Sequence, residues 1–236
     1  QVTGLISGRM AAIRQPGARG YADASHLFGN GLSAGEGTPG NGIAVWANAA
    51  WSNPRDNLSS TDYDGDVVTS MVGVDYEVAS GMRLGLGLGH EWTHFTTTAN
   101  NGYSRSKAIT VVPYMTYMMN DMNFDLQVGY SSVDYDVSRK DPSLITYVET
   151  YKGDTDGSRY FVSLNMNMPY SMDKWRFDTK AGVLYAREKQ DAFSDTSNYK
   201  TGTHLVVLGR ASLGADITYD MGWHSMEPYV GINALS

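Results

Sequence analysis

Residues 72–93 read VGVDYEVASGMRLGLGLGHEWT and contain two stretches of alternating hydrophobicity on either side of a tight turn at 78–81. After the turn, large residues occupy every second position from Leu84 to Trp92, all of them apolar except His90, with glycine or polar residues between them. Successive side chains of a β-strand point to opposite faces, so each stretch predicts a strand with one apolar and one polar face. The segment therefore predicts a β-hairpin.

The connections between such stretches alternate between short and long along the chain. Short turns are predicted at 78–81, 120–121, 171–174 and 220–222, and polar loops at about 53–65, 96–104, 138–157 and 190–200. Short turns at one end of the strands and long loops at the other are typical of barrels in an outer membrane. The sequence thus predicts an all-β fold, an antiparallel up-and-down transmembrane β-barrel.

Composition narrows the class of protein. The 236 residues suit one large all-β domain, and they include no apolar run long enough for a transmembrane helix, so strands would have to make any membrane span. The net charge of -7 argues against a nucleic-acid partner, because phosphates require a basic face. The absence of cysteine excludes disulfides and thiolate metal sites. No signal peptide is visible at Gln1-Val2-Thr3.

Aromatic residues on the apolar faces predict two belts at the membrane boundaries. Tyr160 and Tyr170, like Trp175 and Tyr185, lie ten residues apart, which in a tilted strand spans roughly 25 Å, the height of the apolar band of such barrels. The predicted girdle consists of Trp51, Tyr76, Trp92, Tyr117, Tyr130, Tyr160, Tyr170, Trp175, Tyr185 and Tyr219.

The opposite faces carry charges of both signs, which predicts a polar lumen. The predicted lumen-facing residues are Asp75, Glu77, Glu91, Asp125, Arg159, Arg176, Asp178, Lys180, Arg210, Asp216 and Glu227.

The first residues predict a helix, because Leu5, Met10 and neighbouring apolar residues have helical spacing. So short a helix is marginal alone in water and needs something to pack against. Arg9 and Arg14 would meet acidic residues of the lumen. We expect a helix over 1–14, a flexible linker rich in Gly, Ser, Asn and Pro over 15–41, and the barrel over 42–236.

Five segments in this order resemble the translocator domain of bacterial autotransporters, the type V secretion family. They are LISGRM at 5–10, GIAVWA at 42–47, VGVDY at 72–76, LGLGLG at 84–89 and EPYV at 227–230. The resemblance implies a twelve-stranded barrel in the outer membrane of a Gram-negative bacterium, with Leu5, Arg9 and Met10 on a helix inside its pore and Trp46 facing the lumen beside it. It also implies an upstream passenger, contact with outer-membrane lipid, lipopolysaccharide and the barrel-assembly machinery, a monomeric barrel, and no catalytic residue, metal or cofactor.

The sequence departs from that family in two respects. We count about nine strands, ending near Ala234, and the terminal aromatic residue of such barrels is absent. A nine-stranded open sheet would leave unpaired edges in lipid, so we expect further strands beyond Ser236. The helix also lacks the paired asparagines with which one branch of the family cleaves itself, since Asn100-Asn101 falls in a predicted loop.

Four motifs of other classes fit the pattern poorly. His90-Glu91-Trp92-Thr93-His94 matches the H-E-x-x-H zinc signature, but that site requires a helix and this segment alternates like a strand. Residues 31–35 match the G-x-S-x-G nucleophile motif, but no helix follows them. The glycine repeat at 85–89 also lacks the following helix that phosphate binding needs, and it indicates small residues facing a crowded lumen. The acidic segments 62–66 and 154–157 are incomplete calcium loops.

Three functions therefore stand beside one another. The first is a translocator that anchors and exports a passenger; the second is a stand-alone porin or adhesin with ligand-binding loops. The third is a hydrolase at the outer rim, using His94, Asp134 and Asp136.

Overall fold

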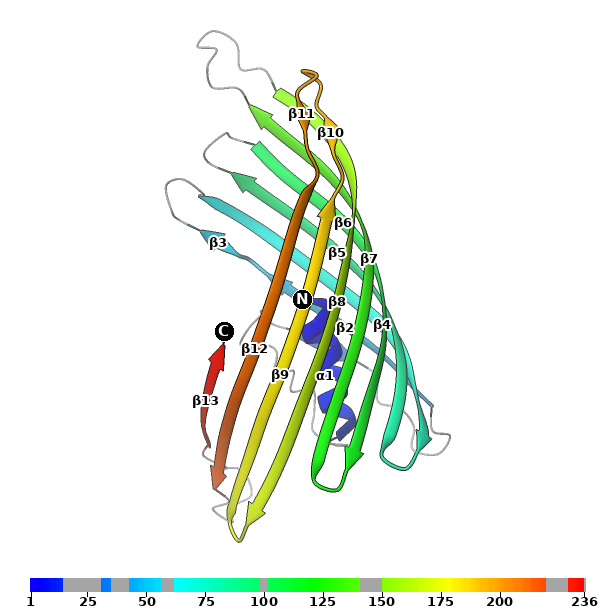
Figure 1. The fold of residues 1–236 in the computed structure, drawn as a ribbon, viewed down its shortest axis with the longest axis vertical. Helices are drawn as coiled ribbons and strands as arrows, with labels where there is room; N and C mark the ends of the chain where they lie inside the picture. Colours follow the sequence, from blue (N-terminus) through cyan, green and yellow to red (C-terminus); the bar gives the residue numbers. More distant parts are fainter. Residues whose placement is uncertain are drawn as a thin grey trace.

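The computed structural model describes residues 1–14, 31–34, 43–56, 62–97, 102–140, 150–219 and 229–235. A single antiparallel sheet of 11 strands dominates them, in the order β1-β2-β4-β5-β6-β7-β8-β9-β12-β13 with β3 beside β4, and β10 and β11 pair separately (Figure 1). The elements are α1 (Val2–Arg14), β1 (Gly31–Ala34), β2 (Ile43–Ser52), β3 (Arg55–Asp56), β4 (Tyr63–Ala79), β5 (Met82–Thr97), β6 (Gly102–Met119), β7 (Met122–Lys140), β8 (Thr150–Met172), β9 (Trp175–Gln190), β10 (Phe193–Ser194), β11 (Lys200–Thr201), β12 (His204–Tyr219) and β13 (Tyr229–Leu235).

The strands follow one another as antiparallel neighbours from β2 to β13, which confirms the predicted all-β up-and-down fold. On β5 the outward side chains of Leu84, Leu86 and Leu88 are 42–50% exposed, while Glu91 on the opposite face is buried. The apolar face is therefore the convex outer face of the sheet, and the buried residues lie inside it.

Short turns join the strands at one end, as predicted. Asn120 and Asp121 join β6 to β7, and Asp173 and Lys174 join β8 to β9. Asn120 and Asp173 adopt positive φ values of 55° and 53°, which asparagine and aspartate tolerate better than most residues. The predicted turn at 220–222 lies outside the described residues.

At the other end the strands run further than the sequence indicated. The predicted loop at 138–157 was too wide, because β7 continues to Lys140 and β8 begins at Thr150, with these two residues paired. Likewise β4 begins at Tyr63, within the predicted loop at 53–65. The polar composition of these segments suggested loops, but their backbone groups are satisfied by neighbouring strands, and composition alone carries no such information.

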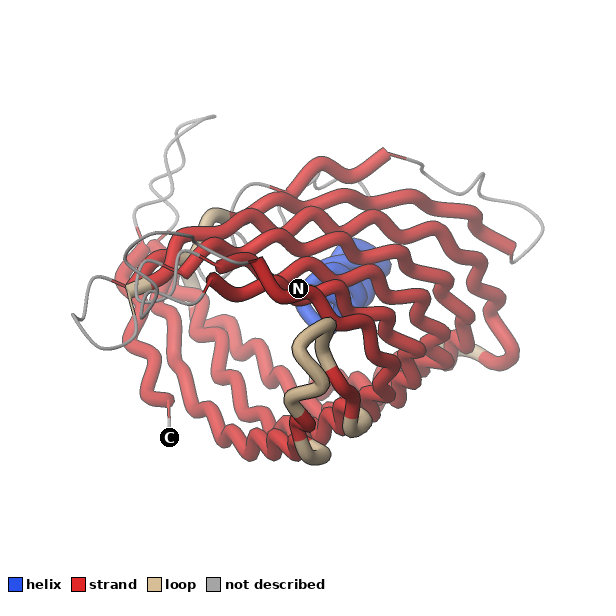
Figure 2. The backbone as a smooth tube through the Cα atoms, turned by 90° about the horizontal axis from the view of Figure 1, so that it is seen from above, coloured by secondary structure: helices blue, strands red, loops and turns tan. Residues whose placement is uncertain are grey.

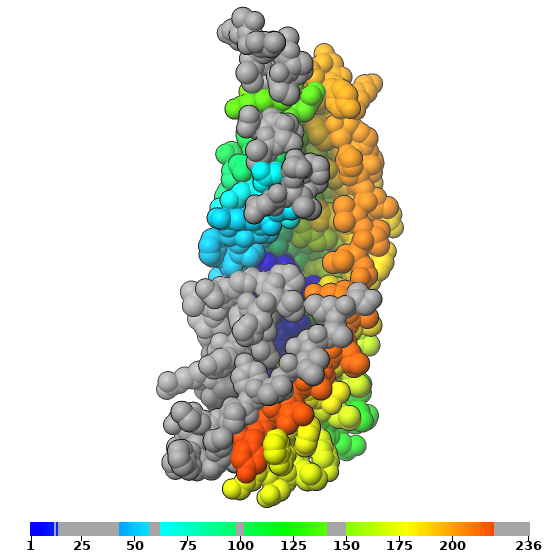
Figure 3. All heavy atoms as spheres, turned by 90° about the vertical axis from the view of Figure 1, so that its left-hand side faces the viewer, coloured from blue at the N-terminus to red at the C-terminus, as the bar shows by residue number. Residues whose placement is uncertain are grey.

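The sheet curls around the helix and leaves one side open (Figure 2). Seen from that side, the helix is visible between the first strands and β12 (Figure 3). Within the described residues, no pairing joins β13 to β1 or β2. The described helix is too short and too polar to cross a bilayer.

Strand β1 lies inside the segment assigned from sequence to a flexible linker. Gly31 pairs with Ala50 and Ala34 pairs with Ala47, so β1 covers part of the free edge of β2. An edge strand offers unpaired backbone groups to any extended segment of suitable length, which accounts for a strand without a strong sequence pattern.

The hairpin of β10 and β11 stands at the long-loop end and is held to the sheet by Asp195. Its Oδ2 accepts hydrogen bonds from Nη2 and Nε of Arg139 at 2.7 and 3.0 Å. Its Oδ1 accepts hydrogen bonds from the backbone amides of Ser197 and Tyr199 at 2.9 and 3.1 Å. Asp195 also accepts a hydrogen bond from the Ser197 hydroxyl. This bond contributes most, and together with the others it lowers the pKa of Asp195 to about 2.

We expect this hairpin to loosen as the pH falls from about 4 to about 2. The pKa of Asp195 is lower in the folded chain than the ~3.9 of an unfolded aspartate, so its contribution is complete above that value. The contribution is lost as the pH falls through the folded pKa of about 2. Pepsin cleavage between β9 and β12, relative to cleavage of an unstructured peptide of the same sequence, should accelerate over this range. In Asp195→Asn the relative rate should be high and independent of pH; a flat wild-type profile would contradict the expectation.

Candidate functional site: the helix and the inner wall

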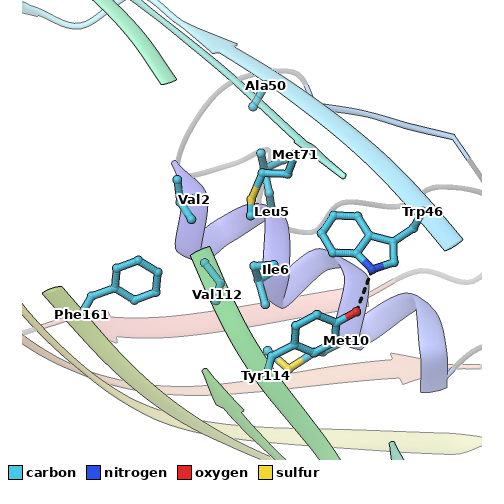
Figure 4. Packing of buried hydrophobic residues seen from close by; sticks show 10 residues of the cluster. All are labelled: Val2, Leu5, Ile6, Met10, Trp46, Ala50, Met71, Val112, Tyr114 and Phe161. Atoms are coloured by element: carbon cyan, nitrogen blue, oxygen red, sulfur yellow. Dashed lines mark hydrogen bonds between the residues drawn. The ribbon is translucent and has the colours of Figure 1, made fainter. Parts of the chain in front are cut away.

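Helix α1 packs one apolar side against the concave face of the sheet, which we call the inner wall. Ile6 and Met10 have no exposed surface, and Val2 and Leu5 are nearly as buried. Their i, i+3 and i+4 spacing places all four on one face. On the wall they meet residues of β2, β4, β6 and β8 (Figure 4), which are Trp46, Ala50, Met71, Val112, Tyr114 and Phe161.

A buried carboxylate connects the helix to the wall. Asp75, whose side chain has no exposed surface, accepts hydrogen bonds from Nε and Nη2 of Arg9 at 2.9 and 3.2 Å. It also accepts hydrogen bonds from Nη1 of Arg83 at 2.7 Å and from the hydroxyl of Tyr114 at 2.8 Å. Such charge-assisted bonds are among the strongest in proteins, and those from Arg9 fix the height of the helix in the barrel.

Trp46 extends this network into the apolar cluster. Its indole Nε1 donates a hydrogen bond to the Tyr114 hydroxyl at 2.7 Å, and the two rings meet edge to face at 63° (Figure 4). Trp46 is 2% exposed. The hydrogen bond to Tyr114 supplies the partner that the indole nitrogen of a buried tryptophan requires.

Two wall amides contact the first turns of the helix. Gln127 donates a hydrogen bond to the Thr3 carbonyl at 3.2 Å and another to the Ser7 hydroxyl at 3.0 Å. Asn48 donates a weaker one to the Leu5 carbonyl at 3.5 Å. The amide oxygens of both side chains are buried and have no protein partner among the described residues. These amides therefore position the helix at some cost in desolvation.

Glycines of the wall make room for the aromatic rings. A Cβ added at Gly73 would lie 2.4 Å from Cζ2 of Trp46, and one at Gly85 would lie 2.1 Å from Cζ of Tyr114. A Cβ at Gly87 would lie 3.0 Å from Cδ1 of Ile6. These contacts confirm that the repeated glycines of β5 face a crowded lumen.

Replacing Gly85 with leucine should lower the free energy of unfolding by about 1–3 kcal/mol, because the new side chain displaces the Tyr114 ring and its bond to Asp75. Gly209→Leu is the matched control, since a Cβ at Gly209 meets no atom within 4 Å. Guanidinium unfolding of both variants in lipid vesicles measures the difference. Equal effects at the two positions would contradict this account of β5.

A second polar network lies on the wall nearer the long-loop end. Arg159 binds Oε1 of Glu91 through Nη1 at 2.9 Å and Oε2 of Glu188 through Nε at 2.6 Å. Thr69 donates a hydrogen bond to Glu91 at 3.3 Å, and Tyr135 donates one to Glu188. This network joins β5, β8 and β9 and holds Glu91 within the wall.

The remaining predicted lumen residues are distributed along the wall as follows. Asp125 accepts a hydrogen bond from Thr116 at 2.8 Å, and the exposed Glu77 pairs with Arg83 near the short-turn end. On β9 and β12, Arg176 pairs with Asp178 at 3.0 Å and Lys180 with Asp216 at 2.7 Å, while Arg210 is half-buried. Glu227 and the side chain of Arg14 lie outside the described residues.

The predicted girdle residues lie on the outer face by strand register. Trp51, Tyr76, Tyr117, Tyr130, Tyr160, Tyr170, Trp175 and Tyr185 are 38–60% exposed. Trp92 and Tyr219 are half-buried because a neighbouring ring covers each of them. The ring centres of Trp92 and His94 are 6.0 Å apart, and those of Tyr219 and Trp175 are 4.7 Å apart.

The alternative motifs do not assemble into catalytic sites. His90 and His94 lie on strand β5, with Glu91 buried on the opposite face, so the helical zinc site is excluded. Nδ1 of His94 accepts a hydrogen bond from Nε of Arg105 at 3.1 Å, and no ion pair joins it to Asp134 or Asp136 among the described residues. Residues 31–34 of the G-x-S-x-G match form β1, and Gly35 lies outside the described chain.

Sequence reasoning did not single out Tyr114, Arg83 or Gln127. Alternation along β6 does place Tyr114 inward between Val112 and Thr116, so a lone large aromatic on a wall of small side chains was the available signal. Nothing comparable marks Gln127, whose role depends on the rotation of the helix.

The chain is similar to known proteins in both sequence and fold. Residues 45–235 match the family model described as the autotransporter beta-domain. The fold is similar to the translocator domain of the autotransporter NalP from Neisseria meningitidis, with 12% identity, a TM-score of 0.63, and coverage of 98% of this chain and 75% of that one. It is also similar to the β domain of the Bordetella autotransporter BrkA, with 17% identity, a TM-score of 0.60, and coverage of 83% and 80%. No curated protein matches the sequence.

Proposed function

This chain belongs to the autotransporter β-domain family, and from that membership we infer that it is the outer-membrane translocator and anchor of an attached passenger domain. The bacterial outer membrane is its location. The outward apolar face of the strands and the inward polar face support this role, because a barrel wall in lipid requires that polarity.

We assign residues 1–14 to a pore helix that connects the passenger to the barrel, 15–41 to a linker that includes β1, and 42–236 to the barrel itself. The observation that carries this assignment is the ion pair of Arg9 with the buried Asp75. A helix that left the barrel during anchoring would have no need of a partner inside the wall.

The proposed partners beyond the passenger are outer-membrane lipid with lipopolysaccharide and the barrel-assembly machinery, and one chain would form one barrel. We propose no enzymatic activity. Supporting this, the only histidine of the candidate rim site within the described residues, His94, is hydrogen-bonded to Arg105 and not to a carboxylate.

Surface display of the passenger tests the proposal in cells that produce the full-length precursor. Added protease should remove the passenger from intact cells producing the wild type. A precursor lacking residues 1–14 of this chain should still insert a heat-modifiable barrel but fail to hold the passenger at the surface. The control replaces Arg176 and Lys180, which lie away from the helix, with glutamine and should display normally. Normal display without residues 1–14 would overturn the pore-helix assignment, and no display by the wild type would overturn the translocator function.

A further inference from the structure

Two rows of outward-facing polar side chains cross four neighbouring strands near the long-loop end. Register places Trp92, Lys107, Asp134 and Asp156 in one row and His94, Arg105, Asp136 and Asp154 in the next, running from β5 to β8. We call these eight residues the outer charged band. They line a groove with a volume of about 580 Å³.

The guanidinium of Arg105 is held in place from two sides. Its Nε donates a hydrogen bond to Nδ1 of His94 at 3.1 Å, and its Cζ lies 4.6 Å from the centre of the Tyr103 ring. Within the described residues, no ion pair joins Arg105 or Lys107 to a carboxylate. The two terminal nitrogens of Arg105 thus remain as a preformed fork, beside the free ammonium of Lys107, for an external anion.

The band lies at the level of lipid headgroups. The rings of Tyr130 and Tyr160, 5.2 Å apart, belong to the outer aromatic belt. Asp134 follows Tyr130 by four residues of β7, which is ~13 Å along the strand and roughly 10 Å along the membrane normal after tilt. Headgroups occupy the ~5–8 Å beyond each side of the hydrocarbon, so the band extends from Trp92 of the belt to the outer edge of this layer, where the phosphates of a glycolipid are the available anions.

The carboxylates of the band define the second requirement. Asp134 stands directly opposite Asp156, and Asp136 directly opposite Asp154. Like charges in such positions repel one another. No group of three or more His, Asp or Glu side chains in the described residues is placed to hold a metal ion by itself. A divalent cation could neutralise these pairs only with oxygens from the ligand, and carboxylate and phosphate oxygens are what hard cations prefer.

We propose that the outer charged band binds a phosphorylated glycolipid of the outer leaflet, with Arg105 and Lys107 holding a phosphate and a shared divalent cation bridging a second phosphate to the carboxylates. The proposal rests on the proposed function only for the placement of the chain in the outer membrane. The charge pattern makes the site selective. The four carboxylates of the band outnumber its two cations, Arg105 and Lys107, so a headgroup that brings one phosphate and no divalent cation would add to the excess of negative charge.

The test compares folded protein in phosphatidylcholine vesicles with and without lipopolysaccharide, in buffer containing magnesium. A ligand that binds the folded state raises the urea midpoint of unfolding. We expect lipopolysaccharide to raise the wild-type midpoint, EDTA to lower that gain, and the double variant Arg105→Gln/Lys107→Gln to lose most of it. The matched control, Lys140→Gln/Lys152→Gln, removes two exposed cations further out on the neighbouring strands β7 and β8 and should keep the full gain.

Each other outcome would overturn the assignment. If lipopolysaccharide raises the urea midpoint of the Arg105 and Lys107 variant as much as that of the wild type, the phosphate site is wrong. If EDTA does not lower the rise in the wild type, the bridging cation is wrong. An equal gain with phosphatidylethanolamine in place of lipopolysaccharide removes the glycolipid. Failure of passenger display would leave all of these vesicle measurements unaffected, so the proposed function and this site can fail separately.

Discussion

Replacing Asp75 with alanine should lower the free energy of unfolding by about 3 kcal/mol, near the lower end of the range for breaking a buried ion pair. The variant deprives Arg9 and Arg83 of the carboxylate they share and removes the acceptor of the Tyr114 hydroxyl. The side chains of Arg9 and Arg83 are 11% and 21% exposed, so water can partly solvate them. The loss of free energy is therefore expected near the lower end of the range.

Urea unfolding in vesicles measures this loss, and trypsin cleavage after Arg9 reports whether the helix has left the wall. Arg9→Ala should cost less than Asp75→Ala, because Asp75 keeps its bond to Arg83 at 2.7 Å. The control Asp178→Asn breaks a more exposed pair with Arg176 and should change the free energy by about 0–1 kcal/mol. A loss from Asp75→Ala no larger than that of the control would contradict the anchoring role.

Replacing Trp46 with alanine should cost about 3–5 kcal/mol, the usual penalty for emptying a buried tryptophan site. The ring lies over Gly73, and its Cη2 atom lies 3.4 Å from the position of a Cβ at Gly87, so the two glycines beneath the ring have no side chain to fill the space. The Tyr114 hydroxyl also loses the hydrogen bond that it accepts from Trp46 at 2.7 Å.

The same unfolding and trypsin measurements test this second expectation. Trp46→Phe should lose about 1 kcal/mol from the hydrogen bond and a smaller part of the packing term, and so fall between the wild type and Trp46→Ala. Trp51→Ala is the matched control because the Trp51 ring is 51% exposed on the outer face. Helix release in Trp51→Ala as great as in Trp46→Ala would place the effect outside the pore.

Strand polarity could be predicted from sequence because the period of two is strict and local. Leu84, Leu86 and Leu88 can all face lipid only if Glu91 faces inward, and no distant residue alters that choice. The extent of β8 could not be predicted in this way. Residues 150–157 are polar on both faces and form a strand because β7 lies alongside them.

The contacts of the helix were the least predictable part. Its apolar spacing indicated that it must pack, and its arginines indicated acidic partners, but several carboxylates were candidates. Arg9 and Asp75 are 66 residues apart in sequence. Their pairing depends on helix rotation and height, which follow from the fit of Ile6 and Met10 around Trp46 and Tyr114. Such a fit is a property of three-dimensional shape, which periodicity does not encode.

The sharing of Asp75 between Arg9 and Arg83 has a consequence for the order of assembly. If the helix withdraws, Arg9 passes into water while Asp75 remains neutralised by Arg83 and hydrogen-bonded by Tyr114, both of which belong to the sheet. The vacated barrel then contains no isolated buried charge at this position, which would otherwise be the most costly defect of the empty state. The wall can thus be completed before the helix arrives, and the helix can dock and undock without dismantling it.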